Sequence, residues 1–173
     1  MMAIEASQAG YYEHTADYSE QYVNERWAEI AGYTKDTLPV QGLTAWWEAR
    51  LHPEDRPRVL EALDDFITGR TEDYLTEFRM QHRNGSWIWI STFARALARD
   101  EAGRVLALAG LEFDITERKQ AMDEIKRLKQ DMENTIQGLP GHVFRVERDD
   151  QQNFIFTLSE GNIASRFGLT TRQ

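Results

Sequence analysis

The sequence predicts an α+β fold in which a five-stranded antiparallel sheet carries helices on one face. Two short strands are predicted near the N-terminus, and the hydrophobic period then lies near 3.6 residues up to about residue 68. From residue 73 to residue 113 the period changes to 2, which is typical of strands. Helices that precede a strand meander, rather than alternate with its strands, predict one layer of helices on an antiparallel sheet.

The first predicted elements are a strand pair and a short helix. The segments Ala9–Thr15 and Tyr18–Val23 are rich in Tyr, Thr and Val and flank a break at Ala16-Asp17, so we expect a hairpin. Asn24 is a favourable N-cap for a helix that runs to about residue 31. Short helical or turn segments are expected from there to residue 50.

A longer helix is expected to begin at Pro53 and to run to about Thr68. Proline suits the first turn of a helix, and the acidic residues after it favour the positive end of the helix dipole. An acid–base cluster around His52 is the alternative interpretation of this segment, but a helix start explains every residue without chemistry. The predicted buried stripe of the helix consists of Val59, Leu63 and Phe66.

Three strands follow, at Asp73–Arg83, Trp87–Ala98 and Arg104–Phe113. In the first, Phe78 and Met80 alternate with charged residues, so one face of this strand should meet solvent. The other two strands are apolar on both faces, so a second element is expected to cover the sheet opposite the helices. In the turn between the first two of these strands, Asn84 and Gly85 are both expected to accept positive φ.

Composition excludes several classes of function. The 173 residues include 29 acidic and 20 basic side chains, a net charge of −9, which disfavours nucleic acid and membrane surfaces as partners. The chain has no cysteine, and its four histidines lack metal-ligand spacing, so neither a disulfide nor a metal site is expected. No export signal, membrane helix or catalytic motif is visible, which predicts a cytoplasmic, non-enzymatic chain.

Five motifs in this order resemble a PAS domain, the sensory module of bacterial signalling proteins. Each motif is weak alone, but five in the right order and spacing are specific, and together they cover about residues 9–118. The resemblance implies an N-terminal tail over 1–8 and a PAS-like sensor domain over 9–113. The motifs are Tyr22-Val23-Asn24 with Ala31-Gly32-Tyr33-Thr34, Leu51-His52-Pro53-Glu54-Asp55-Arg56, Tyr74 with Glu77-Phe78-Arg79, Asn84-Gly85 with Trp89-Ile90, and Gly110 with Asp114-Ile115-Thr116.

Residues 139–173 resemble the opening of a second PAS domain. We expect strands at Gly141–Asp149 and Asn153–Leu158 and a helix at Gly161–Phe167. This copy stops before its long helix and meander, and a hairpin with one helix cannot bury a sufficient core. The chain is therefore expected to be a fragment of a longer protein.

Residues 114–138 are predicted to form an amphipathic linker helix. A signal junction is expected at its start, where Asp114, Thr116 and Glu117 form a capping arrangement in which Asp114 accepts from a backbone N–H near Glu117 and Glu117 reaches back. Two interpretations of the helix remain open: a parallel coiled coil that forms a homodimer and relays a signal, or a helix packed on its own sheet. The heptad-spaced seam is Ala121, Ile125, Leu128, Met132, Thr135 and Leu139.

The resemblance also implies a ligand pocket between the inner face of the sheet and the long helix. The candidate lining residues are Trp47, Phe66, Phe78 and Ile90. Aromatic side chains with this spacing are more often ordinary core, and no buried polar residue stands out that would specify a ligand.

Two cofactors of this family are not expected here. Some PAS relatives bind haem through a histidine on the long helix, and others bind flavin through a cysteine adduct. Pro53–Thr68 contains no histidine and the chain contains no cysteine, so no cofactor is predicted, while an unknown small ligand stays open.

The predicted function is that of a non-catalytic sensory and dimerisation fragment. It would relay a signal through the linker helix to an effector domain outside this chain, either a histidine kinase or a diguanylate cyclase, as the resemblance implies. The alternative is a small-molecule or cofactor receptor with a defined ligand in its pocket.

Overall fold

The computed structural model of the chain describes residues 8–39, 41–138, 144–148 and 154–158. Two compact units divide the chain, Met1–Lys119 and Gln120–Gln173. The second unit contains most of α5 (Thr116–Gly138), and the hairpin strands β6 (Phe144–Arg148) and β7 (Phe154–Leu158). The first contains β1 (Gly10–Thr15), β2 (Gln21–Val23), α2 (Glu25–Ile30), η1 (Lys35–Thr37), α3 (Leu43–Glu48), α4 (Arg56–Ile67), β3 (Asp73–Gln81), β4 (Trp87–Arg99) and β5 (Val105–Asp114).

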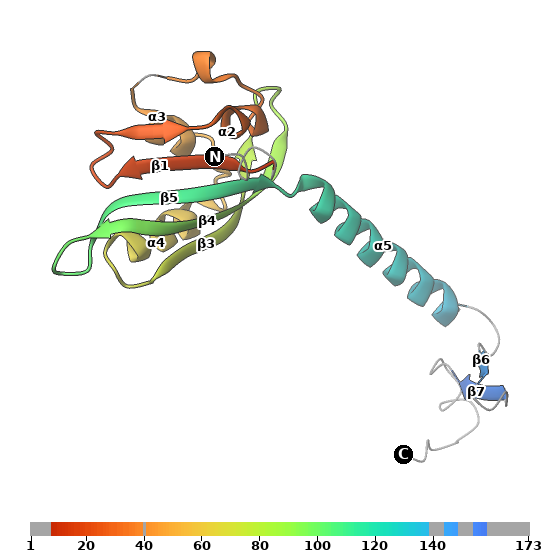
Figure 1. The fold of residues 1–173 in the computed structure, drawn as a ribbon. Helices are drawn as coiled ribbons and strands as arrows, with labels where there is room; N and C mark the ends of the chain where they lie inside the picture. Colours follow the sequence, from red (N-terminus) through yellow and green to blue (C-terminus); the bar gives the residue numbers. More distant parts are fainter. Residues whose placement is uncertain (1–7, 40, 139–143, 149–153, 159–173) are drawn as a thin grey trace. The chain divides into compact units, whose positions relative to one another are not determined.

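The five strands of the first unit form one antiparallel sheet in the order β2-β1-β5-β4-β3 (Figure 1). The first and last strands are neighbours, because Gly10 of β1 pairs with Glu112 of β5. Helices α2 and α4 pack on one face, where Trp27 and Phe66 are buried. This arrangement confirms the predicted α+β fold with a five-stranded sheet and helices on one face.

Alternation along the strands positions the core. In β3, Phe78 and Met80 are buried on the inner face, as predicted, and Ile88 and Ile90 of β4 face the same way. Val59 of α4 packs against this set and is completely buried. Burial of large apolar side chains contributes about 1.5–3 kcal/mol each, so these residues hold the helices on the sheet.

Helix α4 begins at Arg56 and not at Pro53, so the predicted start was three residues early. The chain before the helix is tied to β3, because the backbone N–H of His52 donates to the carbonyl of Arg79 (2.9 Å). A turn at residues 53–55 is then needed to bring the chain round to the helix. Pro57, not Pro53, lies in the first helical turn, where its missing N–H costs nothing.

Two predicted turns differ from the observed ones. The second strand begins at Gln21 rather than Tyr18, because Tyr18 adopts φ 59° within a longer turn. In the β3–β4 turn only Gly85 has positive φ (89°), and Asn84 instead accepts hydrogen bonds from Ser86 N and Oγ (2.9 and 2.7 Å). In the first turn Asp17 Oδ1 accepts from Ser19 N (3.0 Å), so both turns rely on side-chain hydrogen bonds that are typical of Asx turns.

The expected cover on the outer face of the sheet is absent among the described residues of the first unit. Leu75 is 71% exposed, and Leu97 and Phe113 are exposed too. Part of this face is covered by cations instead: the Nζ of Lys119 lies 4.6 Å from the centre of the Trp89 ring. Long basic side chains can cover apolar surface while their charges stay in water.

Described parts of the second unit agree with the predicted elements. The helix spans Thr116–Gly138, and β6 and β7 pair antiparallel with Phe144 opposite Leu158. The predicted helix at Gly161–Phe167 lies outside the described residues, and a second PAS domain stays a prediction. No helix in the described part of the chain is long and apolar enough to cross a membrane.

Candidate functional site

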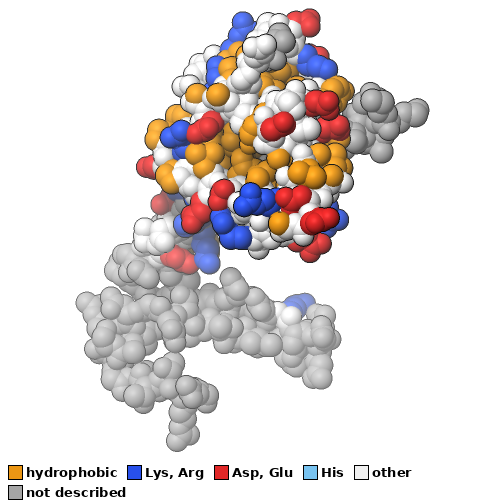
Figure 2. All heavy atoms as spheres, turned by 90° about the vertical axis from the view of Figure 1, so that its left-hand side faces the viewer, with side chains coloured by type: hydrophobic (Ala, Val, Ile, Leu, Met, Phe, Trp, Pro, Cys, Tyr) orange, Lys and Arg blue, Asp and Glu red, His pale blue; other side chains and the backbone are white. Residues whose placement is uncertain are grey.

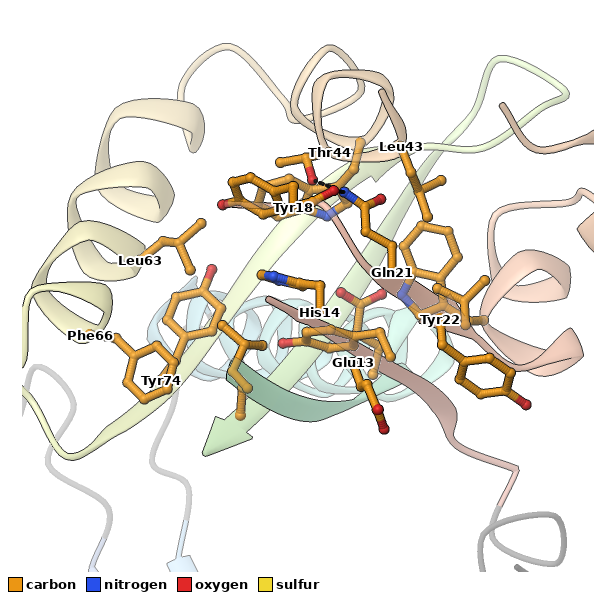
Figure 3. A pocket seen from close by; sticks show the side chains of 17 residues that line it. Glu13, His14, Tyr18, Gln21, Tyr22, Leu43, Thr44, Leu63, Phe66 and Tyr74 are labelled. Carbon is orange, nitrogen blue, oxygen red and sulfur yellow. Dashed lines mark hydrogen bonds between the residues drawn. The ribbon is translucent and has the colours of Figure 1, made fainter. Parts of the chain in front are cut away.

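A cavity of about 70 Å³ lies in the first unit between the inner sheet face and the helices (Figure 3). The sheet contributes Tyr12, Val23, Tyr74, Ala94, Leu108 and Glu112. The helices contribute Trp27, Leu43, Thr44, Trp47, Leu63 and Phe66, and the β1–β2 region contributes Glu13, His14, Tyr18, Gln21 and Tyr22. Because Glu13, Gln21 and Tyr22 are exposed, the cavity reaches the surface at this region.

Tyr12 forms part of the cavity wall because glycine occupies the facing position on β5. Tyr12 pairs with Gly110 in the sheet, and a Cβ atom at residue 110 would lie 2.4 Å from the Tyr12 ring. The phenol oxygen is also fixed, at 3.0 Å from Thr92 Oγ1. Gly110 therefore determines the position of the Tyr12 ring, and the phenol is held away from the ionised form because burial raises its pKa.

Glu112 places a carboxyl group in this largely aromatic cavity. It is only 4% exposed, and loss of hydration raises its pKa to about 8. The nearby indole of Trp27 offsets this rise in part, although its N–H makes no hydrogen bond of normal geometry. No ion pair of Glu112 occurs among the described residues. The group is thus a protonated carboxylic acid at neutral pH.

Three buried polar atoms of the cavity wall have no hydrogen-bond partner in the described structure. They are the indole nitrogens of Trp27 and Trp47 and the phenol oxygen of Tyr74. A buried donor left unpaired costs about 1–3 kcal/mol, and most such groups in proteins are paired. All three side chains line one cavity, so a polar molecule bound there would be able to pair with them.

The rim of the cavity is formed by the β1–β2 connection. The rings of His14 and Tyr18 lie 4.7 Å apart, and burial lowers the pKa of His14. Gln21 donates to the Tyr18 carbonyl (3.2 Å) and makes a longer contact with Thr44 Oγ1 (3.4 Å), which joins the rim to α3 (Figure 3). On this side of the unit, hydrophobic side chains gather between acidic and basic ones (Figure 2).

Only two of the four predicted pocket residues line this cavity. Trp47 and Phe66 are on its wall, whereas Phe78 and Ile90 are completely buried in the neighbouring core. Trp47 links the two groups, because its ring meets Phe78 edge-on with 5.8 Å between centroids. Whether any of these residues touches a ligand stays a prediction.

Glu112 overturns the expectation that no buried polar residue would stand out. A signal for it was present in the sequence. Along β5, Leu108 and Glu112 share the same parity and therefore the same inner face of the sheet. An acidic residue at an inward position of a central strand is rare enough to indicate a special role.

The segment at His52 has a structural role in the described chain. Asp55 accepts hydrogen bonds from Arg79 N (2.8 Å), Nε (2.9 Å) and Nη2 (2.8 Å), and these contacts lower its pKa to about 2. The His52 ring packs edge-on against Trp87 with 4.5 Å between centroids. These contacts fix the start of α4 to β3, as the simpler interpretation of the segment required.

The junction between the sheet and α5 is held by hydrogen bonds that differ from the predicted capping box. Asp114 accepts from the N–H of Thr116 (2.8 Å) rather than from one near Glu117, and no described hydrogen bond returns from Glu117. Thr116 Oγ1 instead accepts from the N–H of Trp89 (2.9 Å) on β4. The start of the helix is therefore connected directly to a central strand.

The first turn of α5 also contacts the edge strand β3. Glu77 pairs with Arg118 (2.5 Å) and with Lys119 (2.6 Å). Lys119 is the better buried of the two basic side chains, at 28% exposed. Two strands of the sheet therefore contact the first turn of the helix through polar side chains.

The predicted dimer residues form an exposed apolar stripe on α5. Ile125 is 67% exposed, Leu128 55% and Met132 60%. Their flanks carry ion pairs, such as Glu124 with Arg127 (2.9 Å). In the described chain the stripe has no partner, so whether it forms a homodimer stays a prediction.

Comparison with known proteins identifies the family. The model of the family described as PAS fold matches residues 20–111. The sensor protein FixL of Bradyrhizobium diazoefficiens is 30% identical over 99 residues, which are 57% of this chain and 19% of that protein. The chain thus spans about a fifth of the length of this relative.

Solved structures agree with this result. A sensory box histidine kinase/response regulator from Burkholderia thailandensis is 27% identical with a TM-score of 0.65, over 77% of this chain and 96% of that one. The N-terminal domain of a diguanylate cyclase with a PAS/PAC sensor, from Marinobacter aquaeolei, shares the fold at 24% identity and a TM-score of 0.54, over 64% and 98%. Since the family match covers more than half of the chain, the protein belongs to the PAS fold family.

Proposed function

We propose that the chain is a sensory relay that transmits a change in its PAS domain through α5 to an effector domain in cis. The effector would be a histidine kinase or a diguanylate cyclase, the two kinds of protein named among its structural relatives. The contact between Thr116 Oγ1 and the N–H of Trp89 carries the proposal. It connects the start of α5 to β4. This strand is paired with β5, which places Glu112 in the cavity wall.

A relay of this kind needs a helix that responds to its first turn. The bonds of Asp114 and Thr116 and the pairing of Glu77 with Lys119 all act on that turn. A shift of β4 relative to β3 would therefore alter the direction or register of the helix. In a homodimer, two such helices would transmit the shift as a change in their packing.

Homodimerisation through α5 is part of this proposal and is supported by the exposed stripe of Ile125, Leu128 and Met132. In proteins most of the stability of a helix comes from packing of its apolar face, and in α5 this face is exposed. Charged residues on both sides of the stripe are typical of the flanking positions in a coiled coil.

Sedimentation equilibrium of the 173-residue chain tests dimerisation. We expect a dimer for the wild type and a monomer for the double variant Ile125→Asp/Leu128→Asp. Gln130→Asp adds a negative charge on the opposite side of the heptad and serves as the matched control, which should remain dimeric. A wild type that is monomeric at high concentration would contradict the coiled coil.

We infer further that the cavity holds a small ligand, the second candidate function. The observation that favours it is that three side chains with unpartnered buried polar atoms line one cavity together with the buried Glu112. Native mass and absorption spectra of chain purified without denaturation test this proposal. An added mass that is lost in Ala94→Leu, which fills the cavity, is the expected result, and an apo mass for the wild type counts against it.

A further inference from the structure

The electrostatics of the cavity indicate which chemical class of ligand fits it. Glu112 and Glu13 are the carboxyl groups of its wall, and the wall contains no Lys or Arg. An anionic ligand would therefore find no counter-charge there. A cationic ligand would find a buried carboxyl that has no cation of its own, which is costly for the protein until a partner arrives.

Aromatic faces give the same indication. Seven of the seventeen lining side chains are Tyr, Trp or Phe, among them Tyr12, Trp27 and Trp47. A cation over the face of such a ring is attracted by the negative charge of the ring face, and the attraction is stronger where water is excluded. An aromatic cavity with one buried carboxyl is the arrangement that recognises ammonium groups.

The unpartnered polar atoms add a second requirement. The indole N–H groups of Trp27 and Trp47 can only donate, and both are buried on the wall. The Trp27 N–H lies close enough to Glu112 to act on its pKa, so it is the Trp47 N–H that requires a ligand with a hydrogen-bond acceptor in addition to its positive charge. The cavity volume of about 70 Å³ has room for several water-sized groups, since one such group needs about 10–15 Å³, and it therefore suits a small ligand.

We propose that the cavity binds a small organic cation, an amine or quaternary ammonium compound that carries one oxygen acceptor, with the Glu112 carboxylate as its counter-ion. This proposal rests on the proposed ligand-binding function of the same cavity and specifies the class of ligand. A primary amine would donate to Glu112, whereas a quaternary ammonium group would meet the carboxylate and the rings by electrostatic attraction alone.

Binding of a cation should depend on pH, because Glu112 must lose its proton. Burial raises its pKa to about 8, so the carboxylate forms at neutral pH only when a cation stabilises it. The other titratable groups of the wall are Glu13, His14, Tyr12, Tyr18, Tyr22 and Tyr74. Beyond the wall, Glu48 acts on Tyr18, and Arg58 acts on Tyr74 but is already bonded to Thr76 Oγ1 (2.7 Å) and to the Glu77 carbonyl.

Those neighbours should not obscure the titration of Glu112. Burial lowers the pKa of His14, which is therefore neutral above pH 6.5, and burial raises the pKa of Tyr12 and of Tyr74. Affinity for a cation should thus rise by up to about tenfold per pH unit below pH 8 and then level off. At pH 7, binding should release about one proton.

Isothermal titration calorimetry of the complete 173-residue chain with two matched probes tests the proposal. Choline is the cation, and 3,3-dimethyl-1-butanol is its uncharged carbon isostere. Titrations at pH 6, 7 and 8.5, in buffers of different ionisation enthalpy, measure affinity and proton release together. We expect choline to bind at least tenfold more tightly than the alcohol at pH 8.5, with an affinity that rises with pH.

Two variants distinguish the effect of a buried carboxyl on cation binding from that of an exposed one. Glu112→Gln should weaken choline binding at least tenfold, leave binding of the alcohol unchanged and abolish proton release. Glu20→Gln, which removes an exposed charge from the β1–β2 connection outside the cavity wall, is the matched control and should change choline affinity less than threefold. Thermal melts of both variants establish that they are folded.

Four outcomes would overturn the proposal. Equal or tighter binding of the alcohol, or an affinity that falls as pH rises, would indicate an uncharged ligand rich in acceptors and leave the ligand-binding function standing. A ligand that is retained through native purification and is identified by mass as neutral or anionic would also exclude the cation and leave the ligand-binding function standing. If neither probe binds and the natively purified chain has an apo mass, the cation and the ligand-binding function both fail.

Discussion

Asp55 and Glu112 lie in two regions of the PAS domain and show opposite treatments of a buried carboxyl group. Asp55 precedes α4 and is 8% exposed, while Glu112 lies on β5 under the cavity and is 4% exposed. Arg79 donates three hydrogen bonds to Asp55, whose pKa falls to about 2. Glu112 has no such partner in the described chain, and its pKa rises to about 8.

The difference distinguishes a structural carboxyl from one that is available to a ligand. A carboxylate that is paired in the fold contributes stability, and its charge is already compensated by the partner. A buried carboxyl without a cation costs stability at neutral pH, and such groups concentrate at functional sites. The two regions therefore predict opposite effects of removing the charge.

The largest effect is expected for Glu112→Gln. Unfolded chains ionise this residue above its ordinary pKa of 4.5, whereas the folded domain keeps the proton up to about pH 8. Wild-type stability should therefore fall as pH rises from 4.5 to 8 and stay level above that. Chemical denaturation should show the variant about 4 kcal/mol more stable than the wild type at pH 8 and equal to it at pH 4.5.

Equal pH profiles for the wild type and Glu112→Gln would contradict this contrast between the two carboxyls. Such a result would mean that the folded carboxyl ionises as readily as the unfolded one. The most direct control is an NMR titration of the side-chain carboxyl carbon of Glu112, which should have its midpoint near pH 8.

Asp55→Ala should have the opposite sign and a smaller magnitude. Loss of its charge-assisted hydrogen bonds to Arg79 should lower the free energy of unfolding by about 2 kcal/mol at pH 7. Because the folded pKa of about 2 lies below the ordinary value of 3.8, this contribution is complete above pH 3.8 and disappears as pH falls through 2. Urea denaturation at pH 7 and pH 2 measures both limits.

Glu54→Ala is the matched control for Asp55. Glu54 contacts the same guanidinium through Arg79 Nη2 (2.8 Å), but its side chain is 75% exposed. Removal of this exposed partner should leave the unfolding midpoint unchanged. A similar loss for both variants would mean that burial does not distinguish the two acids.

Gly110→Ala should disturb the cavity without changing any charge. The added methyl group would overlap the Tyr12 ring, which lies 2.4 Å from the ideal Cβ position. We expect a loss of about 1–2 kcal/mol in the free energy of unfolding. The loss should shrink when Tyr12 is also replaced by Ala, and a double-mutant cycle measures this coupling. Additive losses would show that the two residues do not press on each other.

Much of the fold could be predicted from the sequence because its elements depend on local patterns. The alternation of Phe78 and Met80 with charged residues placed the inner face of β3, and Asn24 capped α2 as expected, with its side chain accepting from Trp27 N (2.9 Å). The start of α4 was predicted wrongly because it depends on a distant strand. The bond from His52 N to the Arg79 carbonyl is invisible to a pattern of neighbours.

The cavity was harder to predict than the fold. Trp47 and Phe66, two of the four candidates that the resemblance implied, lie on the cavity wall, but the sequence could not separate them from Phe78 and Ile90, which fill the adjacent core. A cavity is set by the way several elements pack together, and no single segment encodes it. Glu112 is different, because the alternation along β5 places it on the inner face of the sheet. The sequence pattern alone was therefore enough to find this residue.

Asp114→Ala is expected to have the smallest effect on stability and to test the junction two residues beyond Glu112. Asp114 is the exposed counterpart of that buried acid, and its bond to Thr116 N (2.8 Å) is typical of those that start a helix. Its loss should cost about 1 kcal/mol and uncouple the sensor from its effector in signalling assays of the full-length protein. Glu117→Ala is the control: it should change neither property, because Glu117 returns no described hydrogen bond to the cap. Equal losses for the two variants would favour the reciprocal capping box, and unchanged signalling in Asp114→Ala would remove this residue from the relay.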